Sequence, residues 1–118
     1  MSVTQTWAAV CPLDDLEVER GVAALVNGQA VAIFRTHDGR VYGLGNQDPF
    51  SRASVLARGI VGTRTVDGEE VPFVASPMHK HAFDLRSGQC LDEPQVMVAS
   101  YDVRVVDGVV EVGPRRSP

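Results

Sequence analysis

The sequence predicts an all-β fold, an antiparallel β-sandwich or small barrel with little helix. Asn-Gly or Asp-Gly pairs occur at positions 27–28, 38–39, 67–68 and 107–108, each between runs rich in Val, Ile, Phe or Tyr. These pairs favour two-residue hairpin turns because Asn, Asp and Gly tolerate a positive φ. Tyr101, Val103 and Val105 alternate with charged residues, which places apolar side chains on one face of a strand. No stretch of comparable length has a period of 3.6 residues, so we expect a meander of antiparallel strands.

Nine strands are expected where apolar and β-branched runs lie between turn signals. In chain order they are Thr6–Val10, Gly21–Val26, Gln29–Thr36, Arg40–Gly45, Ile60–Val66, Glu69–Ala75, Ala82–Leu85, Tyr101–Val106 and Val109–Val112. The second and third flank the turn at 27–28, and the fourth follows the turn at 38–39. The fifth and sixth flank the turn at 67–68, and the last two flank the turn at 107–108. Between the fourth and fifth, residues 49–57 suit a short helix or an irregular turn, with Ser51 available as an N-cap.

The composition indicates one acidic domain over residues 1–118, with a core at about 6–113 and a loose tail at 114–118. Hydrophobic residues make up 44% of the chain, and surface scaling allows about two-thirds of its surface to be buried. A net charge of −4 without a basic stripe argues against nucleic acid as a partner. No apolar run approaches the ~20 residues of a membrane helix. We expect no membrane association, and, since no secretory signal is recognised, a cytoplasmic location.

The two cysteines, Cys11 and Cys90, are expected to be free thiols. Two cysteines cannot form the disulfide framework of small secreted domains, and a reducing compartment keeps thiols reduced. Neither lies in a Cys-x-x-Cys pair or beside an activating cation in the sequence, so no redox role is expected.

The three histidines have generic spacing. His37 precedes a predicted turn and is expected to be a solvated hairpin residue. His79 and His81 would point to one side of an extended segment, and with Asp48 they could form the two-His-one-carboxylate set that suits mononuclear iron. The alternative is that His79 caps a loop and His81 is solvated. No nucleophile elbow, phosphate loop or dinucleotide fingerprint is present, so no catalytic residue is assigned to the isolated chain.

Residues 76–91, Ser-Pro-Met-His-Lys-His-Ala-Phe-Asp-Leu-Arg-Ser-Gly-Gln-Cys-Leu, resemble the second cluster-binding loop of Rieske iron-sulfur domains. In that family the loop begins Cys-Pro-x-His and continues through Phe-Asp-x-x-x-Gly. Residues 44–51, Leu-Gly-Asn-Gln-Asp-Pro-Phe-Ser, then fall where the first loop, Cys-x-His, would be. The resemblance implies a Rieske-like fold with two protruding loops. It places Asn46, Asp48, Ser76 and His79 at the four ligand positions.

These four positions keep one Rieske ligand of four. A Rieske cluster is held by two Cys thiolates on one iron and two His on the other, whereas only His79 is retained here. The amide, carboxylate and hydroxyl at the other three positions are hard oxygen donors. We therefore expect an iron-sulfur domain without its cluster, and no cofactor or metal bound by this chain.

The stretch from about Thr6 to Gly113 is similar to the small subunits of the assimilatory NADH-dependent nitrite reductases. Its more specific segments are residues 27–35, 45–51, 55–62 and 76–88, and Ser-Pro in place of Cys-Pro is typical of that subunit. The resemblance implies an accessory oxidoreductase subunit of a cytoplasmic complex that reduces nitrite to ammonium in nitrate assimilation. Its partner would be the large subunit, which would use NADH, FAD, siroheme and an iron-sulfur cluster.

The resemblance also implies that the two loops lie side by side. Pro49, Phe50, Pro77 and Met78 would then give the loops an exposed apolar surface for docking on the large subunit. The alternative is that another sheet face makes this contact. Two other functions are also considered, a Rieske-type ferredoxin that carries electrons and a mononuclear metal protein using His79, His81 and Asp48.

Overall fold

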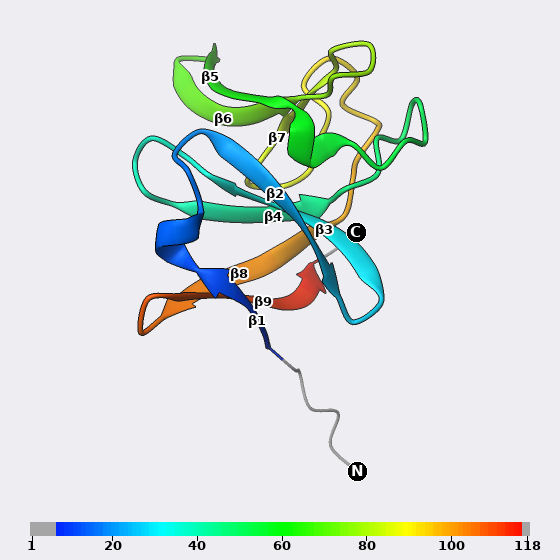
Figure 1. Cartoon of the computed structure of the whole chain (residues 1–118). Helices are drawn as coiled ribbons and strands as arrows, with labels where there is room; N and C mark the ends of the chain where they lie inside the picture. Colours follow the sequence, from blue (N-terminus) through cyan, green and yellow to red (C-terminus); the bar gives the residue numbers. More distant parts are fainter. Residues whose placement is uncertain (1–6, 117–118) are drawn as a thin grey trace.

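A computed structural model describes residues 7–116, which form nine strands and two short 3-10 helices (Figure 1). The elements are β1 (Ala8–Pro12), η1 (Leu13–Asp15), β2 (Arg20–Val26), β3 (Gln29–Arg35), β4 (Val41–Gly45), η2 (Leu56–Arg58), β5 (Ile60–Val66), β6 (Glu69–Ala75), β7 (Ala82–Asp84), β8 (Ser100–Val106) and β9 (Val109–Arg116). The predicted all-β class is therefore confirmed, and β5 and β6 have the predicted bounds. Within residues 7–116, no helix has the length and apolar character to cross a bilayer.

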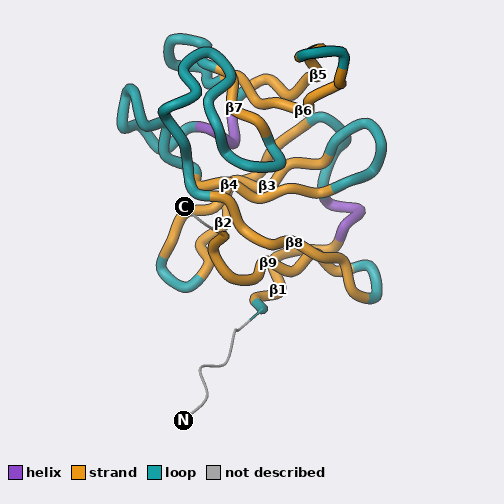
Figure 2. Tube along the Cα trace, turned by 180° about the vertical axis from the view of Figure 1, so that it is seen from behind, coloured by secondary structure: helices purple, strands orange, loops and turns teal. Residues whose placement is uncertain are grey.

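The strands form two antiparallel sheets. The larger has the order β1-β9-β8-β4-β3-β2, and contact between its edge strands β1 and β2 nearly closes it into a barrel. The smaller has the order β5-β6-β7 and lies over one end of the larger sheet, as both views show (Figures 1 and 2). The fold is thus a small barrel with a three-stranded sheet above it, and two loops project from the upper part.

Three of the four predicted turns have the expected two-residue geometry. Asn27-Gly28, Asp67-Gly68 and Asp107-Gly108 all have positive φ at both residues, as this turn type requires. The turn at 38–39 differs, because only Gly39 has a positive φ and the hairpin closes with Thr36 N–H donating to the Arg40 carbonyl. His37 lies in this longer turn and is exposed, as predicted.

The core has two parts, which meet on the two faces of β3. Val31 and Ile33 face the barrel interior, where they pack with Val110 and Val112 of β9. Their neighbours in β3 face the smaller sheet and join a cluster that includes Phe34, Leu44, Leu56, Val74 and Phe83. Successive side chains of a strand point to opposite faces, and both faces of β3 pack against a core cluster. For this reason β3 is apolar at every position from 30 to 34.

Two elements, β1 and β9, differ from their predicted bounds by more than one residue. β1 begins at Ala8 and extends to Pro12, two residues later than predicted, and Thr6 lies outside the described residues. β9 continues to Arg116, so the expectation of a loose tail is wrong for residues 114–116. Pro114 lacks an amide donor, but the register shifts beside it and the pairing resumes at Arg115 with Tyr101, because a bulge tolerates proline. Residues 49–57 contain turns and the start of η2, which confirms the expected short helix or irregular turn, although Val55 rather than Ser51 precedes the helix.

The Phe-Asp-x-x-x-Gly motif, residues 83–88, has a structural role. Phe83 is buried, and Asp84 accepts hydrogen bonds from the backbone and side chain of Arg86. Gly88 has φ +85° and donates to the Asp84 carbonyl, and a Cβ there would lie 2.2 Å from the carbonyl oxygen of Val98. Only glycine fits this close approach.

A second close approach ties together the bases of the two projecting loops. The first loop follows β4 and leads through η2 to Gly59, and the second follows Ala75 at the end of β6. A Cβ on Gly59 would lie 2.4 Å from the carbonyl oxygen of Ala75. The chain leaving the first loop is therefore in backbone contact with the chain entering the second.

Candidate functional site

The candidate site is the pair of projecting loops, and Asn46 fixes the base of the first. Its side-chain carbonyl accepts the Ala57 N–H at 2.8 Å, and its amide donates to the Ser54 hydroxyl at 2.9 Å. Its backbone N–H donates to Ala30 and its carbonyl accepts the Leu56 N–H. Asn46 is 5% exposed, so its polar groups are used to hold the loop rather than to bind a ligand.

Asp48 and Ser76 join the two loops directly. The Ser76 hydroxyl donates to Asp48 Oδ2 at 2.5 Å, and both side chains are buried. The other carboxylate oxygen, Oδ1, accepts the Phe50 N–H at 2.8 Å and the Ser51 N–H at 3.5 Å. A buried carboxylate therefore binds one loop to the other at two of the positions that the Rieske resemblance assigns to cluster ligands.

The environment of Asp48 favours its charged form. Burial raises the pKa of the carboxyl, but the hydrogen bonds from the Ser76 hydroxyl, the amides of Phe50 and Ser51 and the Ser51 side chain lower it more. The net result is a pKa below the ordinary value of 3.8, because hydrogen bonds to a carboxylate stabilise its ionised form. The contact between the loops is thus a charge-assisted hydrogen bond at neutral pH.

We define residues 48–53 as the first loop, residues 76–81 as the second loop, and the two together as the two-loop end. The two loops have the same backbone hydrogen-bonding pattern. In each loop, the side chain of the first residue accepts the N–H of the third: Phe50 to Asp48 (2.8 Å) and Met78 to Ser76 (3.1 Å). The carbonyl of the first accepts the N–H of the fifth: Arg52 to Asp48 (2.7 Å) and Lys80 to Ser76 (3.1 Å). The N–H of the first donates to the carbonyl of the sixth: Asp48 to Ala53 (2.8 Å) and Ser76 to His81 (2.9 Å).

This equivalence is also present in the sequence, although the predicted features do not include it. Asp-Pro-Phe-Ser-Arg at 48–52 and Ser-Pro-Met-His-Lys at 76–80 share the pattern of a side-chain acceptor, Pro, an apolar residue, any residue and a cation. An Asp or Ser followed by Pro is a common start of a turn. Comparison of the two segments with each other would have revealed the paired loops.

An aromatic contact forms a second link between the loops. The Phe50 ring stacks on the His81 ring, with centroids 3.8 Å apart and an interplanar angle of 12°, and lies 6.3 Å from the Phe83 ring. His81 Nε2 lies 3.5 Å from a carboxylate oxygen of Glu93. Phe50 is half-buried against the core cluster, so the expectation that it forms part of an exposed apolar surface needs correction.

The exposed apolar surface of the two-loop end belongs mainly to the second loop. Pro77 and Met78 are exposed, Met78 at 40%, whereas Pro49 is half-buried. His79 is also exposed and has φ +67°. The side chains at the outer end of this surface are therefore Pro77, Met78, His79 and Lys80.

The residues at the Rieske ligand positions do not fit a [2Fe-2S] cluster. Three of the four offer oxygen donors, and their polar atoms are already paired with protein groups. The contact between Asp48 and Ser76 also occupies the space between those two positions. Neither cysteine replaces the missing thiolates, because Cys90 is fully buried and Cys11 lies in β1, where burial and Asp15 raise the pKa of its thiol.

The mononuclear metal site that His79, His81 and Asp48 could have formed is not present. The segment from 76 to 80 is a turn rather than a strand, so the two histidines do not share a face, and Asp48 is committed to Ser76. Among residues 7–116, no group of three His, Cys, Asp or Glu side chains is placed to hold a metal ion.

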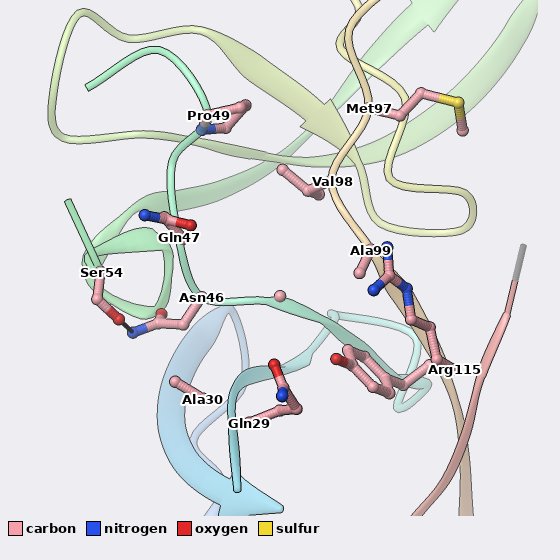
Figure 3. A pocket seen from close by; sticks show the side chains of 12 residues that line it. Gln29, Ala30, Asn46, Gln47, Pro49, Ser54, Met97, Val98, Ala99 and Arg115 are labelled. Atoms are coloured by element: carbon pink, nitrogen blue, oxygen red, sulfur yellow. Dashed lines mark hydrogen bonds between the residues drawn. The ribbon is translucent and has the colours of Figure 1, made fainter. Parts of the chain in front are cut away.

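A groove of about 470 Å³ lies beside the first loop (Figure 3). Its lining comprises Gln29, Ala30, Gly45, Asn46, Gln47, Pro49, Ser54, Met97, Val98, Ala99, Tyr101 and Arg115. Asn46 is turned toward Ser54 rather than into the groove (Figure 3). The lining contains one charged residue, Arg115, and neither a histidine nor a carboxylate.

Comparison with known proteins decides the family. Residues 6–113 match the Rieske-like [2Fe-2S] domain. The NADH nitrite reductase small subunit of Salmonella typhimurium is 44% identical over 107 residues, which are 90% of this chain and 95% of that protein. The chain belongs to the small-subunit family of NADH nitrite reductases, within the Rieske-like domains. A crystal structure of a proposed NADH-dependent nitrite reductase small subunit from Mycobacterium tuberculosis has 43% identity and a TM-score of 0.86, covering 98% of this chain and 99% of that one.

A segment similar to this chain also occurs within a large subunit. A nitrite reductase [NAD(P)H] large subunit from Klebsiella oxytoca is 36% identical to this chain over 110 residues, which are 93% of this chain and 11% of that protein. In that protein, a segment similar to this chain is part of the large subunit itself. The predicted resemblance to the small subunits of NADH-dependent nitrite reductases is therefore confirmed.

Proposed function

We propose that this chain is an accessory subunit of a cytoplasmic NADH-dependent nitrite reductase, which reduces nitrite to ammonium in nitrate assimilation. The large subunit would use NADH, FAD, siroheme and an iron-sulfur cluster for the electron transfer. This chain would contribute by binding the large subunit and would not be catalytic alone. The Klebsiella large subunit, which contains a similar segment, supports this pairing.

One observation carries the proposal that the chain acts without a cluster of its own. Asp48 and Ser76, at two cluster-ligand positions, are bonded to each other at 2.5 Å. A cluster needs soft thiolate ligands with free space between the loops, whereas this contact closes the two loops on each other. The chain therefore keeps the two-loop end as a protein surface.

We further propose that the two-loop end contacts the large subunit. Pro77 and Met78 present apolar side chains at its outer end, and exposed apolar surface on a folded domain often marks a protein contact. The hydrogen bond between Ser76 and Asp48 and the stacked rings of Phe50 and His81 join the loops and hold this surface in place. A preorganised surface loses less conformational entropy on binding.

Anaerobic co-expression with the large subunit from the same organism tests this function. We expect the two chains to co-purify, and the small chain purified alone to contain no stoichiometric iron and to have no visible absorption band. Two irons per small chain would contradict the proposal and favour a ferredoxin. Failure of the chains to associate would contradict the accessory role.

A further inference from the structure

Arg52 and Lys80 occupy equivalent positions in the two loops. Each is the fifth residue of its loop, and each donates its N–H to the carbonyl of the residue that joins the loops, Asp48 or Ser76. Their φ angles are both +63°. The fold therefore places Arg52 next to Asp48 and Lys80 next to Ser76, on the two sides of the hydrogen bond that joins the loops.

The backbone at both positions would suit glycine better. Among residues 7–116, five glycines have a positive φ, and a non-glycine residue in this conformation is strained. In the described part of the chain, four non-glycine residues other than Asn and Asp have a positive φ, and three of them, Arg52, His79 and Lys80, lie in the two-loop end. Non-glycine side chains at strained positions of a projecting loop are candidates for a binding role.

Within residues 7–116, neither the Arg52 nor the Lys80 side chain forms an ion pair or a hydrogen bond. Of the eleven Arg and Lys residues, six form ion pairs with carboxylates and Arg35 donates to backbone carbonyls. Four have no carboxylate partner among residues 7–116, and two of these four are Arg52 and Lys80. Both are exposed, on a chain whose net charge is −4. The two-loop end thus presents unpaired positive charge beside the apolar Pro77 and Met78.

We infer that Arg52 and Lys80 are a pair of docking cations that bind carboxylates on an acidic surface of the large subunit, flanking the apolar contact of Met78. The inference rests on the proposed function, because it specifies the chemistry of the same surface. Complementary charges at the edge of an interface speed association and fix the orientation of the partners. They also make binding sensitive to salt.

Charge reversal tests the inference in the complex of the full chains. The double variant Arg52→Glu and Lys80→Glu should raise the Kd for the large subunit at least about tenfold at low salt and flatten the salt dependence of binding. Arg20→Glu with Arg58→Glu is the matched control, because it changes the charge equally at two exposed residues of another groove. We expect that control to change Kd less than about threefold.

Cross-linking tests the contact itself. Lys80 is the chain's only lysine, so a carbodiimide, which couples an amine to a carboxylate in direct contact, should join the subunits through Lys80. Lys80→Arg keeps the charge but removes the amine, so it should bind normally and lose this cross-link. If the complex forms but the double reversal leaves the Kd unchanged, or the control weakens binding equally, or no cross-link involves Lys80, the inference is wrong and the proposed function stands. Absence of any complex with the unmodified chain overturns both.

Discussion

Asp48→Ala is expected to lower the free energy of unfolding by about 3 kcal/mol or more. The substitution removes the acceptor for the Ser76 hydroxyl and for the amides of Phe50 and Ser51. Each buried donor left without a partner costs roughly 1–3 kcal/mol. Urea denaturation of the purified chain, followed by circular dichroism, measures this loss.

Asp38 provides a matched control for Asp48. Its Oδ1 also accepts a side-chain hydroxyl, from Thr36, and a backbone amide, from Arg40, but the residue is exposed. Asp38→Ala should therefore destabilise the chain much less than Asp48→Ala. If the two substitutions lower the free energy of unfolding equally, burial of the contact between the loops contributes nothing to stability.

The contribution of Asp48 to the free energy of unfolding should also depend on pH. Its folded pKa is lowered, so its stabilising effect is fully present above the unfolded pKa of about 3.9 and is lost as the pH falls through the folded pKa. The neutral variant Asp48→Asn should be less stable than the unmodified chain at pH 7, and this difference should narrow below about pH 4. A difference that stays constant through that range would contradict an ionised Asp48.

Met78→Asp is expected to weaken binding to the large subunit about 30-fold or more, which corresponds to about 2 kcal/mol. The substitution removes an exposed apolar side chain from the two-loop end and places a charge where the partner would exclude water. Because Met78 is already 40% exposed, the fold should tolerate the change. Titration calorimetry with the purified large subunit measures the affinity.

Val106→Asp is the control for Met78→Asp. Val106 is equally exposed, at 40%, but lies at the end of the β8–β9 hairpin, away from the two-loop end (Figure 1). We expect this variant to bind as the unmodified chain does. The docking proposal fails if Met78→Asp binds normally, or if Val106→Asp has the larger effect.

Turn chemistry made the strands predictable. Dipeptides such as Asn27-Gly28 and Asp67-Gly68 specify local backbone geometry, and the strands beside them pair with the neighbours that the turns dictate. The end of β9 was missed because a Gly-Pro pair normally ends a strand. Its continuation depends on a register shift against β8, which no local pattern indicates.

The sequence predicted the two projecting loops but not the contact that joins them. The resemblance to Rieske domains predicted that the segment with Asn46 and Asp48 and the segment with Ser76 and His79 lie side by side. It gave no sign that Asp48 and Ser76, 28 residues apart, bond to each other. The inward position of Phe50 depends on stacking with His81 in the other loop, a contact across the fold that sequence periodicity cannot report.

Hydrogen exchange of the small chain, measured by mass spectrometry with and without the large subunit, locates the surface that binds the large subunit. We expect this surface to be the two-loop end, closed by Asp48 and Ser76. Binding should slow exchange in peptides covering residues 46–54 and 76–81 and leave the β8–β9 hairpin unchanged. Protection confined to other strands, with the two loops exchanging as in the free chain, would contradict it.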